Sequence, residues 1–233
     1  MMNWLHKLLS TSSDPLAKKL YPVLGFMPKK IELYHQAFCH SSIDAPTYGN
    51  NERLEFLGDS ILNSVITEYL FNKLPDKDEG VLTDIRSKIV SRKTLNHLSK
   101  KLGIDSFVQT NLGTKTPTSI YGNAFEALIA AIYLDKGYKF CKALIIKKVI
   151  KPHFSLKTLE KEISSYKKHF IHWAQKHNKT YYFKLLGETG ESHKKSFEIA
   201  LFIAEKNIAV AQASSKKKAE EAAAKIACET LDL

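Results

Sequence analysis

Three carboxylates recur at helical spacing within residues 51–62. At about 100° per residue, Glu52, Glu55 and Asp59 fall within roughly 60° of one another on a helix. The opposite side of that helix carries apolar residues, namely Leu54, Leu57, Ile61 and Val65. Hard cations such as magnesium and manganese prefer clustered carboxylate oxygens as ligands. The spacing therefore predicts a helix with one core face and one face able to hold a divalent cation.

The same pattern also fits an ordinary amphipathic helix whose acidic face is solvated. Carboxylates three residues apart repel each other, and a cation or a proton between them removes that repulsion. Gly58 precedes Asp59 in the helix interior, where glycine costs roughly 1 kcal/mol relative to alanine. A glycine in such a position is typical of places where another backbone or a ligand approaches closely. Gly58 therefore favours a site over a plain solvent-exposed face.

Lysines open the last predicted helix, within residues 214–220. Serine is favoured at a helix N-cap, but Lys216, Lys217 and Lys218 oppose the helix dipole in the first turn. Residues that break a local rule often serve a function, and lysines at the positive end of a helix can bind phosphate. The alternative is a solvated lysine run on a charged surface.

Composition narrows the classes of partner. The 233 residues include 35 basic and 24 acidic side chains, and the formal net charge of +11 favours nucleic acid or an anionic membrane surface. No membrane partner is expected, because the longest nearly apolar run, residues 124–134, is too short to span a bilayer and contains Glu126. Residues 1–9 lack the features of a secretory signal. Three scattered cysteines predict reduced thiols and a cytoplasmic protein.

Breakers and periodicity divide the chain into two domains. Residues 1–152 are predicted to be mostly α, with an N-terminal extension of about residues 1–14. Residues 153–162 are polar and are interpreted as a short flexible linker, and residues 163–233 as a small α+β domain of order α-β-β-β-α. Helices are expected at 52–74, 84–102, 121–134, 164–177 and 215–231. Strands are expected at 181–186, 195–204 and 208–213, the second with the alternation of a strand that has one buried face.

Residues 51–62, NERLEFLGDSIL, resemble the signature sequence of the ribonuclease III family in a nearly complete match. Three further elements follow the family order. Residues 40–42 resemble its His-x-Ser element, residues 79–86 its E-G-x-L-[ST]-x-x-R element, and residues 122–135 its second catalytic helix. The resemblance covers roughly residues 20–140, and it implies an all-helical endonuclease domain.

The resemblance also assigns roles to acidic residues. It implies that Glu55, Asp59 and Glu126 hold Mg²⁺, for which Mn²⁺ can substitute, and that Asp59 and Glu126 are catalytic. It further implies that Glu52 and Glu79 help to shape the cleavage groove across a homodimer.

Asn123 departs from the family pattern, because many members carry aspartate at this position. Its carbonyl oxygen is still acceptable to a hard cation, so Asn123 joins the expected metal ligands with one negative charge fewer and a weaker metal affinity. Either some members use asparagine here, or this copy has become a binding protein. The intact carboxylates favour an active enzyme: Glu55, Asp59, Glu79 and Glu126.

Residues 162–232 resemble the double-stranded RNA-binding domain, which reads the shape of an A-form duplex. The resemblance implies that Lys216, Lys217 and Lys218 hold phosphates and that His193 enters a minor groove. The alternative for His193 is an exposed loop histidine without such a role.

Together the two resemblances imply an endoribonuclease that cuts double-stranded RNA with a divalent metal and leaves 5′-phosphate and 3′-hydroxyl ends. Ribosomal and other RNA precursors are the expected substrates. The alternative is a non-catalytic double-stranded RNA-binding scaffold of the same fold, for which Asn123 is the discriminating feature. A DNA-binding protein is a third interpretation.

Overall fold

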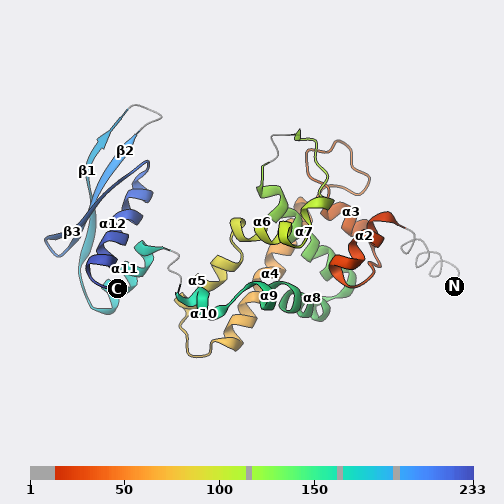
Figure 1. Cartoon of the computed structure of the whole chain (residues 1–233), viewed down its shortest axis with the longest axis horizontal. Helices are drawn as coiled ribbons and strands as arrows, with labels where there is room; N and C mark the ends of the chain where they lie inside the picture. Colours follow the sequence, from red (N-terminus) through yellow and green to blue (C-terminus); the bar gives the residue numbers. More distant parts are fainter. Residues whose placement is uncertain (1–13, 114–116, 162–164, 191–194) are drawn as a thin grey trace. The chain divides into compact units, whose positions relative to one another are not determined.

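The computed structural model describes residues 14–113, 117–161, 165–190 and 195–233 (Figure 1). The chain divides into two compact units, Met1–Glu160 and Lys161–Leu233. The predicted fold class is confirmed, because a helical unit precedes a small α+β unit of order α-β-β-β-α. The expected N-terminal extension lies outside the described residues except for Asp14.

The first unit consists of helices and the loops that join them. They are α2 (Pro15–Leu24), α3 (Ile31–Ala37), α4 (Glu52–Lys73), α5 (Glu79–Ile89), α6 (Arg92–Lys101), η1 (Asp105–Phe107), α7 (Ser119–Lys136), α8 (Tyr138–Leu144), the π-helical segment η3 (Ile145–Ile150), α9 (Lys151–His153) and α10 (Leu156–Lys161). Among the described helices, none is long and apolar enough to cross a membrane.

The helices α4 and α7 pack against each other at the centre of this unit. The buried side of α4 is formed by Leu54, Gly58, Leu62, Val65, Ile66 and Leu70. Leu57 and Ile61, which were expected on that side, are half-buried and pack against the same core. A Cβ atom added at Gly58 would lie 1.7 Å from the carbonyl oxygen of Glu126. The expectation that a backbone approaches Gly58 closely is therefore confirmed.

The single helix expected over residues 84–102 is wrong, because the chain forms two helices there. The α5 helix starts earlier, at Glu79, and ends at Ile89, and α6 starts at Arg92. Ser91 separates them, since its Oγ accepts a hydrogen bond from the backbone N–H of Thr94 at 3.2 Å. A serine N-cap begins a new helix rather than continuing the old one, and the break gives α6 its own direction.

Residues 156–160 pack on the first unit and do not behave as the flexible linker expected there. Leu159 on α10 is 9% exposed and joins the core. The Nζ of Lys88 donates to the carbonyl oxygen of Leu159 at 2.6 Å, and Lys77 forms an ion pair with Glu160. Because the segment is mostly charged, the sequence did not indicate that Leu159 packs α10 against the core of the first unit.

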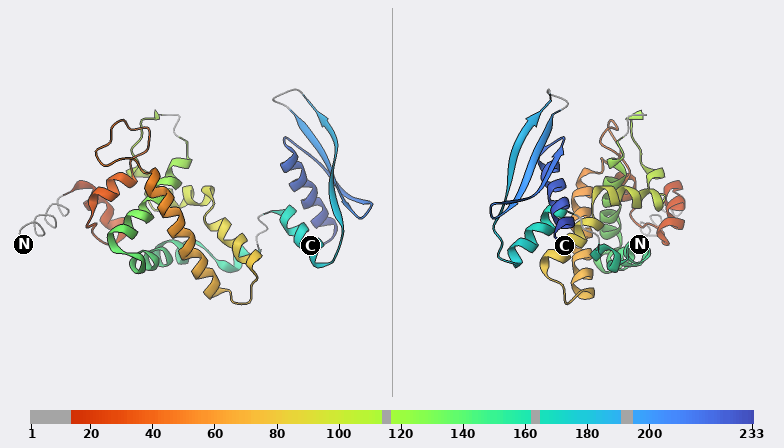
Figure 2. Two further views of the ribbon diagram at one scale, coloured as in Figure 1. Left: turned by 180° about the vertical axis from the view of Figure 1, so that it is seen from behind. Right: turned by 60° about the vertical axis from the view of Figure 1, so that its left-hand side comes forward.

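The second unit is a three-stranded antiparallel sheet with two helices on one face (Figure 2). Its elements are α11 (Tyr166–Lys176), β1 (Tyr181–Thr189), β2 (Ser196–Ile203), β3 (Lys206–Ala213) and α12 (Lys216–Thr230), and the strand order is β1-β2-β3. Phe170 and Ala174 of α11 meet Leu201 of β2 and Ala223 of α12 in the core.

The centre of β2 is buried on both faces, whereas the alternation predicted one buried face. Ile199, Ala200 and Leu201 are all buried. Ala200 pairs with Lys184 on one side and Val210 on the other. Because its side chain is a single methyl group, these longer cross-strand neighbours cover it without any further layer.

The three cysteines are buried and form no disulfide, in agreement with the expectation of reduced thiols. Burial raises the pKa of Cys141 to about 12. Its thiol donates to the carbonyl oxygen of Ile129 at 3.6 Å, so Cys141 acts as a packing residue between α7 and α8.

Candidate active site

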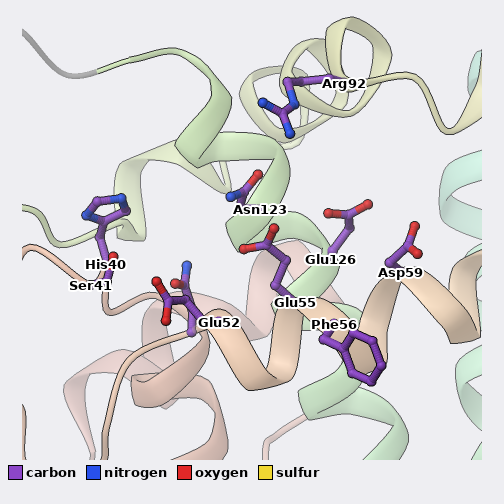
Figure 3. Close-up of a pocket in the computed structure, with 10 residues that line it drawn as sticks. His40, Ser41, Glu52, Glu55, Phe56, Asp59, Arg92, Asn123 and Glu126 are labelled. Atoms are coloured by element: carbon purple, nitrogen blue, oxygen red, sulfur yellow. The ribbon is translucent and has the colours of Figure 1, made fainter.

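A pocket of about 570 Å³ opens beside the crossing of α4 and α7 (Figure 3). Among the residues predicted from the sequence, it is lined by Glu52, Glu55, Asp59, Asn123 and Glu126. It is also lined by His40, Ser41, Asn51, Phe56 and Arg92. Two helices, the start of a third and the loop before α4 therefore contribute to one pocket.

The packing of α4 on α7 explains why these carboxylates share a pocket. Glu55 and Asp59 lie on the same side of Gly58 around the helix, and the backbone of Gly58 touches that of Glu126. Side chains that flank a tight helix crossing emerge together at its edge. Asn51 anchors the start of α4, because its backbone N–H donates to the carbonyl oxygen of Cys39 at 2.9 Å.

The carboxylates are crowded enough to hold a proton near neutral pH. Burial raises the pKa of Glu126 to about 7, and the negative charges of Asp59 and Glu55 add to this rise. Burial also raises the pKa of Glu55, while the positive charge of Arg92 and a hydrogen bond from the Asn123 amide oppose the rise. A cation in the pocket would relieve this repulsion as a proton does.

The donor set fits a hard divalent cation, although it does not form a closed coordination shell. In the described part of the chain, no three His, Cys, Asp or Glu side chains converge closely enough to hold a metal as they stand. Asp59 is also engaged by its neighbour, since the Nδ2 of Asn63 donates to its Oδ1 at 2.7 Å. Magnesium keeps several waters and needs only one or two protein carboxylates. The crowded oxygens of Glu55, Glu126 and Asn123 meet that requirement.

The imidazole ring of His40 lines the pocket and is held at its Nδ1 atom. The backbone N–H of Ser42 donates to its Nδ1 at 3.0 Å, so Nδ1 is an acceptor and the ring proton lies on Nε2. Ser42 is held in turn, because the backbone N–H of Asn111 donates to its Oγ at 3.0 Å. His40 therefore offers a hydrogen-bond donor to a ligand.

Several predicted residues lie outside this pocket. Glu79 begins α5, where its Oε1 accepts from the hydroxyl of Thr83 at 3.0 Å, and it does not line the pocket of the single chain. His193 lies outside the described residues. The expected role of Glu79 at the cleavage groove and the expected role of His193 in a minor groove therefore remain predictions.

The three expected phosphate-binding lysines lie exposed in the first turn of α12. The Oγ of Ser215 caps this turn by accepting from the backbone N–H of Lys218 at 3.3 Å. The Nζ of Lys216 lies 5.8 Å from the centre of the Phe197 ring. Because the side chains of Lys216 and Lys217 form no ion pair within the described part of the chain, their charges are available to a ligand.

Arg92 and Asn63 were missed from the sequence. Asn63 follows Asp59 by four residues, a spacing that could have indicated a side-chain contact. Arg92 reaches the pocket only because a new helix, α6, begins after Ser91, where one continuous helix was expected.

Comparison with known proteins agrees with both halves of the chain. Residues 30–153 match the Ribonuclease-III-like family, and residues 166–231 match the Double-stranded RNA binding motif. Ribonuclease 3 from Zunongwangia profunda is 46% identical over 211 residues, which cover 88% of this chain and 87% of that protein. Ribonuclease 3 from Flavobacterium psychrophilum is 42% identical over 212 residues, which cover 89% and 86%.

A solved structure shares the fold of the first unit. The nuclease domain of ribonuclease III from Campylobacter jejuni superposes with a TM-score of 0.55 and 33% sequence identity, covering 61% of this chain and 99% of that domain. The acidic pocket and the α-β-β-β-α unit lie within the two matched regions. By its sequence matches over nearly its whole length, this chain belongs to the ribonuclease III family.

Proposed function

We propose that the chain is an endoribonuclease that cuts double-stranded RNA by divalent-metal-dependent hydrolysis. The observation that carries the proposal is the shared pocket of Glu55, Asp59 and Glu126 on two helices whose backbones touch. The match of residues 166–231 to the Double-stranded RNA binding motif supports the choice of substrate. The products carry 5′-phosphate and 3′-hydroxyl ends, and the substrates are ribosomal and other RNA precursors in the cytoplasm.

Glu55, Asp59 and Glu126 would hold Mg²⁺ together with the carbonyl oxygen of Asn123, and Mn²⁺ would substitute for Mg²⁺. When bound, the cation supplies Lewis-acid chemistry, which polarises a phosphodiester and makes water a better nucleophile. Asp59 and Glu126 are the catalytic carboxylates of this proposal. Burial and the charges of Asp59 and Glu55 raise the pKa of Glu126 to about 7, and a cation in the pocket would relieve the same repulsion that this proton relieves.

The proposed enzyme is a homodimer, and α4 supports this. Phe56 lies beside the acidic pocket and is 78% exposed, and Phe71 on the same helix is 69% exposed. Burying such a side chain at an interface contributes roughly 1.5–3 kcal/mol. A second copy seated on Phe56 would bring two acidic pockets to one duplex. Glu52 and Glu79 are proposed to line the groove formed in this way.

The second unit is proposed to supply most of the grip on the duplex. Lys216, Lys217 and Lys218 would contact phosphates across the major groove, and His193 would enter a minor groove. Because these are mostly ionic contacts, binding should weaken steeply as the salt concentration rises.

A non-catalytic scaffold is the second candidate, and Asn123 favours it by removing one negative charge from the metal ligands. To separate the two, the full chain is incubated with a long RNA duplex in Mg²⁺ or Mn²⁺, with EDTA controls. Cleavage that needs the metal and yields 5′-phosphate ends supports the enzyme. Duplex binding without cleavage in either metal supports the scaffold. Competition by B-form DNA tests the third interpretation, because an A-form reader should ignore it.

A further inference from the structure

Arg92 projects into the acidic pocket without a partner. It begins α6, and its guanidinium lies over Asn123 on the side toward Glu55 and Glu126 (Figure 3). Within the described part of the chain, it makes no hydrogen bond and no ion pair. It is also the one Lys or Arg among the described residues that line the pocket. The metal-dependent hydrolysis proposed above assigns no role to the Arg92 side chain.

The turn that carries Arg92 is fixed to α7. Asn96 follows Arg92 by one helical turn on the same face, and its Oδ1 accepts from the backbone N–H of Gly122 at 2.8 Å. A Cβ atom added at Gly122 would lie 2.8 Å from that same oxygen. The glycine therefore lets Asn96 sit directly on the first turns of α7, next to Asn123. The backbone that carries Arg92 is therefore held in place by the contact between α6 and α7.

The surroundings of Arg92 are strongly negative, yet no carboxylate engages it. Its charge lowers the pKa of Glu55 and of Glu126 against the effect of burial, which shows that it lies near both. Because it forms no ion pair with either of them in the described structure, its planar fork of N–H donors stays available. A guanidinium with free donors is suited to a ligand that carries paired oxygens.

A second unsatisfied donor lines the same pocket. Asn51 is 2% exposed, and its Nδ2 has no hydrogen-bond partner. A buried donor without an acceptor costs roughly 1–3 kcal/mol, and this nitrogen lies beneath the pocket surface, where a ligand in the pocket does not reach it. A cation cannot satisfy Asn51 Nδ2 or Arg92, since both are donors. The exposed guanidinium of Arg92 therefore offers donors for an anion beside the carboxylates that could hold a metal.

We propose that Arg92 is a substrate-binding residue that donates to a phosphate of the RNA strand in the pocket. The inference rests on the proposed function for its substrate. Four carboxylates repel that strand: Glu52, Glu55, Asp59 and Glu126. The guanidinium offsets part of this repulsion and holds two phosphate oxygens in one geometry. Arg92 would thus place the strand, while the carboxylates hold the metal.

The first test measures duplex binding by the full chain at several salt concentrations. Ca²⁺ replaces Mg²⁺, and the RNA is checked to be intact after each measurement. For Arg92→Ala, the slope of log affinity against log salt should fall by about one unit, because one phosphate is no longer neutralised by the protein. Arg92→Lys should keep the slope because it keeps the charge. Lys93→Ala is the matched control, because Lys93 is the exposed neighbour that does not line the pocket.

The second test separates substrate binding from support of the carboxylates. Single-turnover cleavage by Arg92→Ala should fall roughly 10- to 100-fold, the loss expected for a hydrogen bond between charged groups. Arg92→Lys should recover only part of the rate, since lysine lacks the paired donors. Mn²⁺ should bind the RNA-free Ala variant roughly three- to tenfold more tightly, because a repelling positive charge has gone.

An unchanged salt slope for Arg92→Ala would overturn the proposal. So would Mn²⁺ binding that weakens in parallel with cleavage, because Arg92 would then serve only to hold the carboxylates in place. Equal thermal unfolding of the variants guards against misfolding. If the wild-type chain fails to cleave RNA but the Ala variant still shows the reduced salt slope, the proposed nuclease function fails while the binding of phosphate by Arg92 stands.

Discussion

The acidic pocket and the lysine turn of α12 both gather like charges, but they tolerate them differently. Two of the pocket carboxylates, Glu55 and Glu126, are partly buried, so the repulsion appears as the raised pKa of Glu126, and tight helix packing holds the groups in place. The lysines are exposed at a helix start, where water and salt screen them. The carboxylates stay close together only because the packing of α4 on α7 holds them there, whereas the lysines need only the capped first turn of α12. Substitutions should therefore affect chemistry and stability together in the pocket, and binding alone at α12.

The largest expected effect is on cleavage. Glu126→Gln should lower the cleavage rate by roughly 10³-fold, because it removes a charged ligand from the metal site. Duplex affinity should change less than about twofold, since the second unit supplies most phosphate contacts. Single-turnover cleavage and filter binding measure the two quantities. Equal loss of cleavage and binding would contradict this division of roles between the pocket and the lysine turn.

The next effect is on stability. Gly58→Ala should destabilise the fold by about 3 kcal/mol or more, because the new Cβ collides with a backbone atom that has no free rotation. Gly80→Ala is the matched control, since its added Cβ would meet only the Asp78 side chain, at 3.3 Å. Chemical unfolding measures both variants. If Gly58→Ala unfolds like Gly80→Ala, the two helices are not held by direct backbone contact.

A smaller effect is expected at α12. Lys216→Ala and Lys217→Ala should each weaken duplex binding by about 1 kcal/mol and lower the salt slope by about one unit. Lys225→Ala provides the comparison, because Lys225 lies on the same helix beyond the first turn and faces Glu229 at 3.9 Å. Thermal unfolding should be nearly unchanged in all three. Losses that are equal at all three lysines would indicate a general charge effect instead of a phosphate site.

The smallest effect is a pH dependence of the metal-free protein. The pKa of Glu126 is raised from 4.5 to about 7 in the folded state, so the folded chain binds the proton more tightly than the unfolded chain. The contribution of Glu126 to stability should then fall as the pH rises from about 4.5 to about 7, by an amount on the order of 1 kcal/mol after allowance for screening. Glu126→Gln should remove this dependence. Unfolding curves in EDTA from pH 5 to 8 would show it, and a flat wild-type curve would contradict it.

Local patterns predicted the parts of the molecule that depend on local chemistry. The acidic face of α4, the core on its other side and the close approach at Gly58 were all visible as spacing within one helix. The order of the second unit followed from alternating strands and a capped final helix. These features depend on residues that are near one another in the sequence.

The missed features depend on contacts between distant segments. The break between α5 and α6 is an exception, because Ser91 caps α6 locally, but the leucine and isoleucine periodicity continues on both sides and concealed it. Leu159 docks α10 through a contact with Lys88 that no local pattern reveals. Arg92 enters the site only through that same unpredicted break. Whether the carboxylates converge on one ion also depends on side-chain rotamers, which spacing does not determine.

The contact of Gly58 with the Glu126 carbonyl has a consequence for how this protein can diverge. The separation of the two acid-bearing helices is limited by the radii of backbone atoms, not by the volumes of interchangeable core side chains. Exchanges among Leu62, Val65 and Ile66 can therefore accumulate and alter thermal tolerance while the acidic groups keep their spacing. Core residues can therefore be substituted without changing the geometry of the acidic pocket, as long as position 58 remains glycine.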